Sequence, residues 1–339
     1  MFSKHMANIR EIAKKANVSI ATVSRILNND PNFHTKESTK VAVNKAIEEL
    51  GYKPQRKIKL TNIGCVLSIG AEKYSDPFFT TILATCENEA EKHNIIFSHI
   101  RHYSELKNEL ILKEFLNSGI KGLIIMEKLP YDILETIKKN IPNIVYIDYD
   151  ESTDEVNSIG FDHRIANKKV FDYLIECGYK RIAVIGESSP VTKLEDSIRM
   201  NAYREVLLKN KIEYDPSIIK DCKSDSEICA KQTRELMNLD NPPDVIFVGD
   251  DTLANITMLE LKRLGYECPK DIGVMGFNNL PIASHTNPPL TTVDLPMVDI
   301  GKKAIERLIQ IMDNDDKEKY KISFPTELII RESTRRNKK

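Results

Sequence analysis

Residues 8–28 carry a close succession of helix-start and helix-stop signals, and they constrain the fold more tightly than any other part of the chain. Asn8 is followed three positions later by Glu11, which is a capping-box pattern. Asn17 suits the left-handed turn that ends a helix, and Ser19 can cap the helix that follows. The pattern therefore predicts two short helices joined by a tight turn, a helix-turn-helix.

The second of these helices has one apolar side and one polar side. Val23 and Ile26 fall on the side that packs inward. The outward side carries small or polar residues, namely Ile20, Ala21, Thr22, Ser24 and Arg25. A third helix follows with its apolar face at Val43, Ala46, Ile47 and Leu50. The major groove of DNA admits a helix whose outward side carries small and polar residues, as the second helix does. This three-helix unit is therefore suited to bind DNA.

The charges of the chain are divided unevenly along it. Residues 1–60 contain twelve Lys and Arg against five Asp and Glu, a net charge of +7, and the remaining residues carry −8. A basic head favours a polyanionic partner. A lysine-rich surface that is merely solvated is the alternative explanation of this charge. The charge therefore favours DNA binding only together with the adjacent helix-turn-helix.

The head resembles the DNA-binding domain of the lactose/galactose repressor (LacI/GalR) family. The resemblance rests on IREIAKKANVSIATVSRILNN over residues 9–29 and on AIEELGYKP over residues 46–54. It implies that Ile20, Ala21 and Arg25 read bases, while Ser19, Thr22, Ser24 and Asn28 contact the backbone or support the helix. In that family a hinge leucine also wedges into the minor groove. The linker over residues 55–61 is short and lacks the usual Ala-Arg, so Leu60 is the nearest candidate.

From Ile63 onward, short apolar runs alternate with longer amphipathic stretches, which predicts an α/β fold with parallel sheets. The predicted strands lie at 63–69, 95–100, 122–126, 144–147, 181–185, 245–248 and 272–276. The predicted helices lie at 79–92, 107–117, 132–140, 163–177, 195–210, 227–239 and 251–265. Chain crossings between two lobes are expected near 150–158 and 288–296.

This body resembles the periplasmic-binding-protein-like core of the same family, with two lobes of parallel sheet. The predicted organisation is a head at 1–54, a linker at 55–61, a first lobe at 62–158 and 294–319, a second lobe at 159–293 and 320–333, and a basic tail at 334–339. Sheets of this kind bind small molecules at the carboxyl ends of their strands.

The resemblance places effector contacts at six positions, each at a strand end or a helix start: Asp76, Phe78, Asp148, Arg199, Asp250 and Asn278. Carboxylates and amides bind sugar hydroxyls, and an aromatic ring covers the C–H face. Structural roles are open as well, because Asp76 and Asp250 can cap helices, Asp148 can be a turn residue and Arg199 can pair with Glu195. Where relatives place a stacking aromatic, this chain has Cys222 or Lys223.

Other functions lack their signatures. The chain contains no Gly-rich phosphate loop and no G-x-S-x-G motif, so we expect no enzyme, no catalytic residue and no cofactor. The cysteines form no C-x-x-C pair, and His99 and His102 lack a third ligand at metal spacing, so no metal is expected. No N-terminal run is apolar enough for a signal peptide, which favours the cytoplasm and no membrane. A sugar transport receptor and an enzyme with a doubly wound core are the alternatives.

Taken together, these features predict a sugar-responsive transcriptional repressor. A homodimer would bind double-stranded, pseudo-palindromic operator DNA, because symmetric dimers require symmetric half-sites. Release by a sugar is expected, and the resemblance to galactoside-linked repressors suggests galactose or a β-galactoside.

Overall fold

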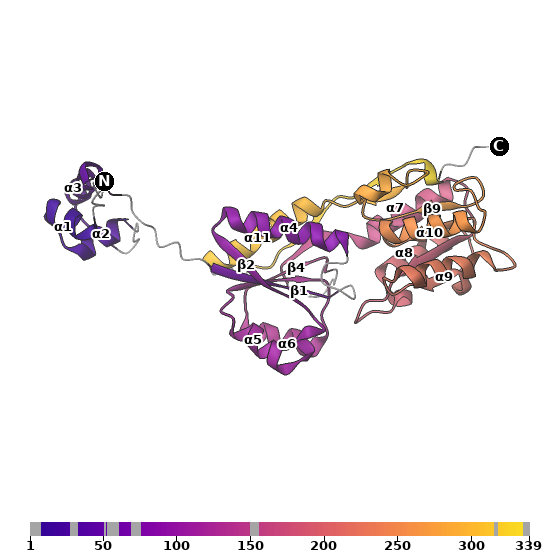
Figure 1. Cartoon of the computed structure of the whole chain (residues 1–339), viewed down its shortest axis with the longest axis horizontal. Coiled ribbons are helices and arrows are strands. Elements are labelled where there is room, and N and C mark those ends of the chain that lie inside the picture. Colours follow the sequence, from indigo (N-terminus) through magenta and orange to yellow (C-terminus); the bar gives the residue numbers. More distant parts are fainter. Residues whose placement is uncertain are drawn as a thin grey trace, which may run out of the picture. The chain divides into compact units, whose positions relative to one another are not determined.

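The structure, a computed structural model, divides the chain into two compact units, residues 1–59 and 60–339. It describes residues 8–27, 33–50, 52, 61–68, 76–149, 156–314 and 318–334. The first unit contains the head, and the second contains the core (Figure 1). The predicted linker at 55–61 lies outside the described residues except for Thr61, which begins the first strand of the core.

The head consists of α1 (Ile9–Lys15), α2 (Ile20–Leu27) and α3 (Glu37–Leu50). The predicted capping box is present: Asn8 Oδ1 accepts from the backbone amide of Glu11 at 3.2 Å, and Glu11 Oε2 accepts from that of Asn8 at 2.9 Å. Asn17 has the predicted positive φ of 53°. A small core joins the three helices through Ile12, Ala13, Val23, Val43 and Ala46.

The core holds two parallel sheets. The first has the order β11-β5-β4-β3-β1-β2, and the second has the order β7-β6-β8-β9. The strands of the first sheet are β1 (Thr61–Leu67), β2 (Ile95–His102), β3 (Gly122–Met126), β4 (Ile144–Ile147), β5 (Ser158–Phe161) and β11 (Lys321–Phe324). Those of the second are β6 (Ile182–Gly186), β7 (Ile219–Asp221), β8 (Val245–Val248) and β9 (Gly273–Met275). The antiparallel pair β10 (Thr292–Asp294) and β12 (Glu327–Ile329) adds a small third sheet.

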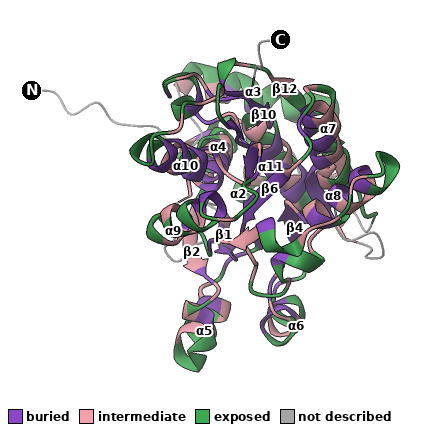
Figure 2. Ribbon diagram, turned by 90° about the vertical axis from the view of Figure 1, so that its right-hand side faces the viewer, coloured by how far each residue is buried: buried purple, intermediate pink, exposed green. Residues whose placement is uncertain are grey.

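Helices cover both faces of the first sheet and so define the first lobe (Figure 1). They are α4 (Pro77–Lys92), α5 (Glu109–Asn117), α6 (Tyr131–Asn140) and α11 (Met297–Asn314). Alternate residues of each strand face opposite ways: Ile124 packs in the cluster with α4 and α11, and Ile125 packs in the cluster with α5 and α6. The approach of α11 to α4 is close, since a Cβ on Gly301 would lie 2.8 Å from Cβ of Thr85. Figure 2 shows buried residues on the strands and exposed residues on the outer sides of α5 and α6.

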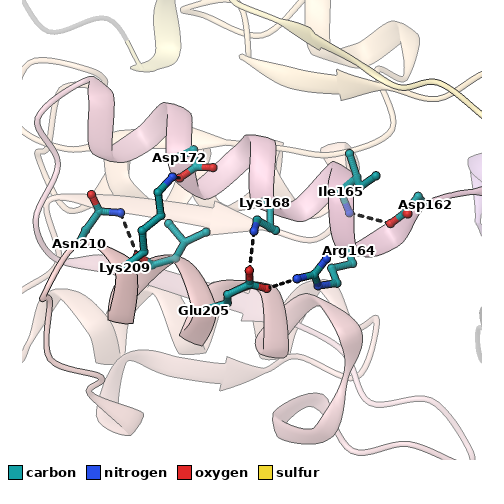
Figure 3. A network of polar contacts seen from close by, with 9 residues as sticks. Asp162, Arg164, Ile165, Lys168, Asp172, Glu205, Lys209 and Asn210 are labelled. Carbon is teal, nitrogen blue, oxygen red and sulfur yellow. Dashed lines mark hydrogen bonds and ion pairs between the residues drawn. The ribbon is translucent and has the colours of Figure 1, made fainter.

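The second lobe is built in the same way around the second sheet. Its helices are α7 (His163–Glu176), α8 (Ile198–Lys209), α9 (Ser226–Met237) and α10 (Asp251–Arg263). Val184 and Phe247 face the cluster that includes α7 and α8, whereas Ile185 and Val248 face the one that includes α9 and α10. On the surface, Glu205 of α8 forms ion pairs with Arg164 and Lys168 of α7, and Lys209 pairs with Asp172 (Figure 3).

The lobe boundaries differ from those predicted. We assigned 159–293 and 320–333 to the second lobe, but β5 and β11 pair with each other in the first sheet, with Phe324 opposite Phe161. The polar stretch near 150–158 therefore connects two strands of one sheet, and the chain crosses only after β5. Both strands are short and mix polar with apolar residues, so they lack the continuous apolar run that marks the predicted strands. Thr334, which we placed in the basic tail, is fully buried.

Candidate nucleic-acid interface and interlobe cavity

The outward face of α2 is available for contact with DNA. Ser19, Ile20, Ala21 and Arg25 are exposed, and Thr22 and Ser24 are half-buried. The Ser19 hydroxyl accepts from the backbone amide of Thr22 at 3.0 Å, so Ser19 begins the helix as predicted. Asn28 and Leu60, the other two members of the predicted DNA-binding set, lie outside the described residues.

Arg25 has a local support that the sequence did not indicate. Its guanidinium carbon lies 5.3 Å from the centroid of the Phe33 ring. A cation held over an aromatic face loses some of its freedom to move. The arginine predicted to read bases is therefore partly oriented before any DNA is bound.

Two adjoining cavities lie between the lobes of the core. The larger has a volume of about 330 Å³ and the smaller about 80 Å³, and both are lined by Glu127, Asp148, His163, Glu187 and Arg199. The lining comes from the first lobe through Glu127 and Asp148, and from the second through Glu187 and Arg199. A site so divided depends on how the two lobes are arranged, and its size suits a small molecule.

The six predicted effector residues all line the smaller cavity: Asp76, Phe78, Asp148, Arg199, Asp250 and Asn278. Their convergence follows from the topology, because the carboxyl ends of the parallel strands in each lobe point to the gap between the lobes. Their predicted role in binding an effector stays a prediction.

Two of these aspartates also cap helices, which is the structural role that the sequence left open for them. Asp76 caps α4 by accepting from the backbone amide of Phe78 at 2.8 Å. Asp250 caps α10 by accepting from the amide of Thr252 at 2.7 Å, and it also accepts from Nδ2 of Asn278 at 3.2 Å. Each aspartate thus combines a helix cap with a place in the cavity wall, since a cap uses only part of a carboxylate's accepting capacity.

Arg199 has little support from other polar groups. Its Nη2 donates to the carbonyl of Gly249 over a long 3.4 Å, and its guanidinium lies 5.5 Å and 5.4 Å from the ring centroids of Phe247 and Phe277. Nε is buried and has no hydrogen-bond partner. The pairing of Arg199 with Glu195 that we left open is not among the contacts of the described residues. A buried donor without a partner is costly, and because Arg199 lines both cavities, its guanidinium can donate to a ligand oxygen there.

Sequence reasoning missed several residues of the cavity wall: Glu127, Phe161, His163, Glu187 and Phe277. The available signal was position, because Glu127 follows β3 and Glu187 follows β6. Phe161 and Phe277 supply apolar rings, with centroids 6.2 Å apart, although Cys222 or Lys223 replaces the aromatic that relatives place elsewhere.

Burial shapes the acid–base behaviour of the cavity. It raises the pKa of Asp76 to about 6 and that of Glu187 to about 7, and it raises the pKa of Glu127 well above its usual range. Neighbouring carboxylates add to the effect on Glu127, since like charges disfavour ionisation. Burial also lowers the pKa of Arg199, while the surrounding acids oppose that change.

Two further properties concern the described part of the chain. No group of three or more His, Cys, Asp or Glu side chains there is arranged to hold a metal ion. None of the described helices is long and apolar enough to cross a membrane.

Comparison with known proteins matches the head and the core to two different family models. Residues 8–55 match the model of bacterial regulatory proteins of the lacI family, and residues 171–334 match that of a periplasmic binding protein-like domain. The chain is 29% identical over 337 residues to the HTH-type transcriptional repressor CytR of Escherichia coli (strain K12), covering 97% of this chain and 96% of the relative.

Similarity extends to a second regulator and to a solved structure. The chain is 28% identical to catabolite control protein A of Priestia megaterium, covering 96% of this chain and 99% of that protein. A complex of the transcriptional regulator CelR with cellobiose superposes with a TM-score of 0.72 at 25% identity, covering 96% and 99% of the two chains. Head and core thus occur together, in this order, along the full length of these proteins.

Proposed function

The chain belongs to the LacI family of bacterial regulatory proteins, and from this premise we propose that it represses transcription as a homodimer on a pseudo-palindromic operator and is released by a sugar. The observation that carries the proposal is the interlobe cavity, where residues from both lobes of the core converge. CytR is a transcriptional repressor and CelR a transcriptional regulator, which supports a regulator over an enzyme. Its place of action would be the cytoplasm, where operator DNA lies.

The arrangement of the cavity supports control by a small molecule. A ligand that contacts Asp148 of the first lobe and Arg199 of the second favours one arrangement of the lobes over others. Only such a difference in affinity between conformations can shift an equilibrium. A coupling free energy of about 1–3 kcal/mol would change operator affinity roughly 5–150-fold.

The chemistry of the lining supports a sugar. Carboxylates of Asp76 and Asp250 accept from hydroxyl groups, the Asn278 amide donates and accepts, and the ring of Phe78 lies in the same wall. Because the head resembles those of galactoside-linked repressors, galactose and β-galactosides are the first sugars to test. Cellobiose belongs in the same screen, since the similar regulator CelR was solved with it.

The test is operator binding with and without sugar. Fluorescence anisotropy of the full-length chain should show tighter binding to a palindromic duplex with a central CG step than to a scrambled duplex of the same composition. Affinity should fall steeply between roughly 50 and 200 mM salt, because phosphate contacts release counterions. An effector should then release the palindrome at constant salt. A transport receptor or an enzyme would show no preference between the duplexes.

A matched pair of variants separates the cavity from the DNA-binding surface. Arg199→Ala should abolish the response to the effector and leave operator affinity without effector unchanged. Arg204→Ala, on the same helix, removes an arginine that does not line the cavities and should respond like the wild type. Full release of the Arg199→Ala variant by the effector would refute the assignment of the cavity as the effector site.

A further inference from the structure

The charges around the interlobe cavity do not balance. Acidic side chains outnumber basic ones in the wall of the smaller cavity, which contains Asp76, Glu127, Asp148, Glu187 and Asp250 against Arg199 and His163. The larger cavity adds Lys128 and Asp196, one of each sign. A neutral sugar would compensate none of this acidic excess when it displaced water, and each carboxyl group that stayed ionised would remain buried without a counter-charge, which is costly.

Three of the carboxylates are already occupied by donors from the protein. Asp76 and Asp250 accept from the backbone amides of the helices that they cap. Asp148 accepts from Nε2 of His163. These three carboxylates therefore have hydrogen-bond donors even when no ligand is bound.

Glu127 and Glu187 differ from the others. Among the described residues, neither carboxylate has a hydrogen bond or an ion pair, although both are half-buried in the cavity wall. They belong to different lobes and line the same cavities. Burial raises the pKa of both, and repulsion by Glu187 adds to the rise at Glu127. Two carboxyl groups that have no partner and line one space from two lobes favour a ligand group with several donors.

Arg199 indicates a second feature of the ligand, a hydrogen-bond acceptor. Its guanidinium lines both cavities and makes one long hydrogen bond, from Nη2 to the Gly249 carbonyl, so it can donate to an acceptor such as a hydroxyl oxygen. The geometry argues against a bound metal ion, because the described residues hold no group of three or more acidic, His or Cys side chains placed to ligate one. An organic molecule with both hydroxyl groups and a positive charge satisfies all of these groups.

We propose that the effector is an amino sugar whose ammonium group binds between Glu127 and Glu187 while a hydroxyl oxygen accepts from Arg199. This inference rests on the proposed function, since it specifies the ligand of the same site. An ammonium group offers three donors, enough for both carboxyl groups, and its single positive charge compensates one ionised carboxylate. Because the glutamates come from opposite lobes, the cation attracts both lobes and favours their closure. The amine is thus the part of the ligand that selects one conformation.

Matched pairs of probes test the proposal by calorimetry on the full-length chain at pH 7.5. The pairs are galactosamine with galactose and glucosamine with glucose, and each N-acetylated sugar keeps the nitrogen but removes the charge. We expect at least one amine to bind about tenfold or more tighter than its neutral counterparts, which corresponds to about 1.4 kcal/mol. Putrescine and Mg²⁺ serve as cations without a sugar ring and should bind more weakly than that amine.

Three variants locate the effect. Glu127→Gln and Glu187→Gln should each lose the preference for the amine, since the amide lacks the negative charge and keeps the shape. Glu205→Gln is the control, because Glu205 lies on the outer surface between α7 and α8 (Figure 3) and should keep the preference. A preference that persists in both cavity variants contradicts the proposal, and so does equal binding of neutral sugars or the failure of every amine to bind.

These outcomes are distinguishable from a failure of the proposed function. If neutral sugars bind and release the operator while amines do not, the chain is a sugar-responsive repressor and the amino sugar is wrong. If an amino sugar binds with the expected preference but leaves operator binding unchanged, the ligand is right and the proposed regulatory function is wrong.

Discussion

Asp148, the residue after β4, accepts a hydrogen bond from Nε2 of His163, the first residue of α7. The carboxylate belongs to the first lobe and the imidazole begins a helix of the second, so this contact joins the lobes beside the cavity. Asp148 holds a positive φ of 60°, which turns its side chain out of the line of the strand. This contact favours the arrangement of the lobes in which the cavity walls meet, and a ligand that contacts both lobes favours the same arrangement.

His163→Ala is therefore expected to weaken effector binding. A hydrogen bond to a charged group contributes a net free energy of about 1.5–3 kcal/mol. Loss of this contact in the bound state should therefore lower effector affinity roughly tenfold or more. Titration calorimetry with the effector measures it. His93→Ala is the matched control, because His93 is an exposed surface residue of the same lobe as Asp148. Equal affinities of the two variants would contradict this role for His163.

Gly249→Ala probes the position of Arg199 without altering the arginine. A Cβ on residue 249 would lie 2.0 Å from Nη1 of Arg199, so the guanidinium must move. We expect a loss of effector response similar to that of Arg199→Ala, with operator affinity in the absence of effector retained. The control is Gly160→Ala, whose Cβ would meet its nearest neighbour, the Asp148 amide nitrogen, at an ordinary 3.4 Å. An unchanged response of Gly249→Ala in the release assay would show that the guanidinium position is unimportant.

Local roles of residues in this chain follow from the sequence, whereas contacts across the fold do not. The resemblance placed Asp76 and Asp250 in the cavity wall, and their helix caps were predictable because an aspartate directly before a helix commonly caps it. The strands β5 and β11 were not, since they mix polar and apolar residues where the predicted four-residue strands β4 and β8 are apolar throughout, and their pairing across more than 150 residues is a tertiary contact. The sequence also did not reveal that Glu127 and Glu187 face each other's lobe. Which polar residues meet across a gap depends on packing, which no local pattern encodes.

Asp251 provides a prediction on stability and pH. Its side chain is fully buried and accepts from the backbone amide of Leu280 and from the hydroxyl of Thr292, each at 2.7 Å. Burial is the main cause that raises its pKa to about 7, from 3.8 for an unperturbed group. The folded protein therefore holds a proton that the unfolded chain has lost between pH 4 and 7. The stability contributed by that proton is complete below pH 4 and disappears as the pH rises to 7.

Asp251→Asn should flatten this dependence. Each pKa unit corresponds to about 1.4 kcal/mol, so the free energy of unfolding should fall less between pH 4 and 7 in the variant than in the wild type. Asp76 and Glu187, whose pKa values are also raised, should leave a residual slope. Urea denaturation of the full-length chain at several pH values measures the effect. The exposed Asp240→Asn should keep the wild-type slope, and an identical slope in Asp251→Asn would show that this carboxyl group does not carry the proton.

The last prediction concerns base reading by Arg25, which the structure places exposed on α2 with its guanidinium over Phe33. Arg25→Ala should lose about 1–3 kcal/mol of discrimination between operator and scrambled duplex. Arg25→Lys should keep most of the non-specific affinity, because the charge that attracts phosphate remains, but it should lose discrimination, because an ammonium cannot form the planar, two-pronged contact with a base edge. Lys45→Ala removes an exposed charge of the same head and should weaken binding to both duplexes alike. Retained discrimination in Arg25→Lys would mean that Arg25 contributes only charge, and base reading would then rest on Ile20 and Ala21, the exposed residues at the start of the same helix.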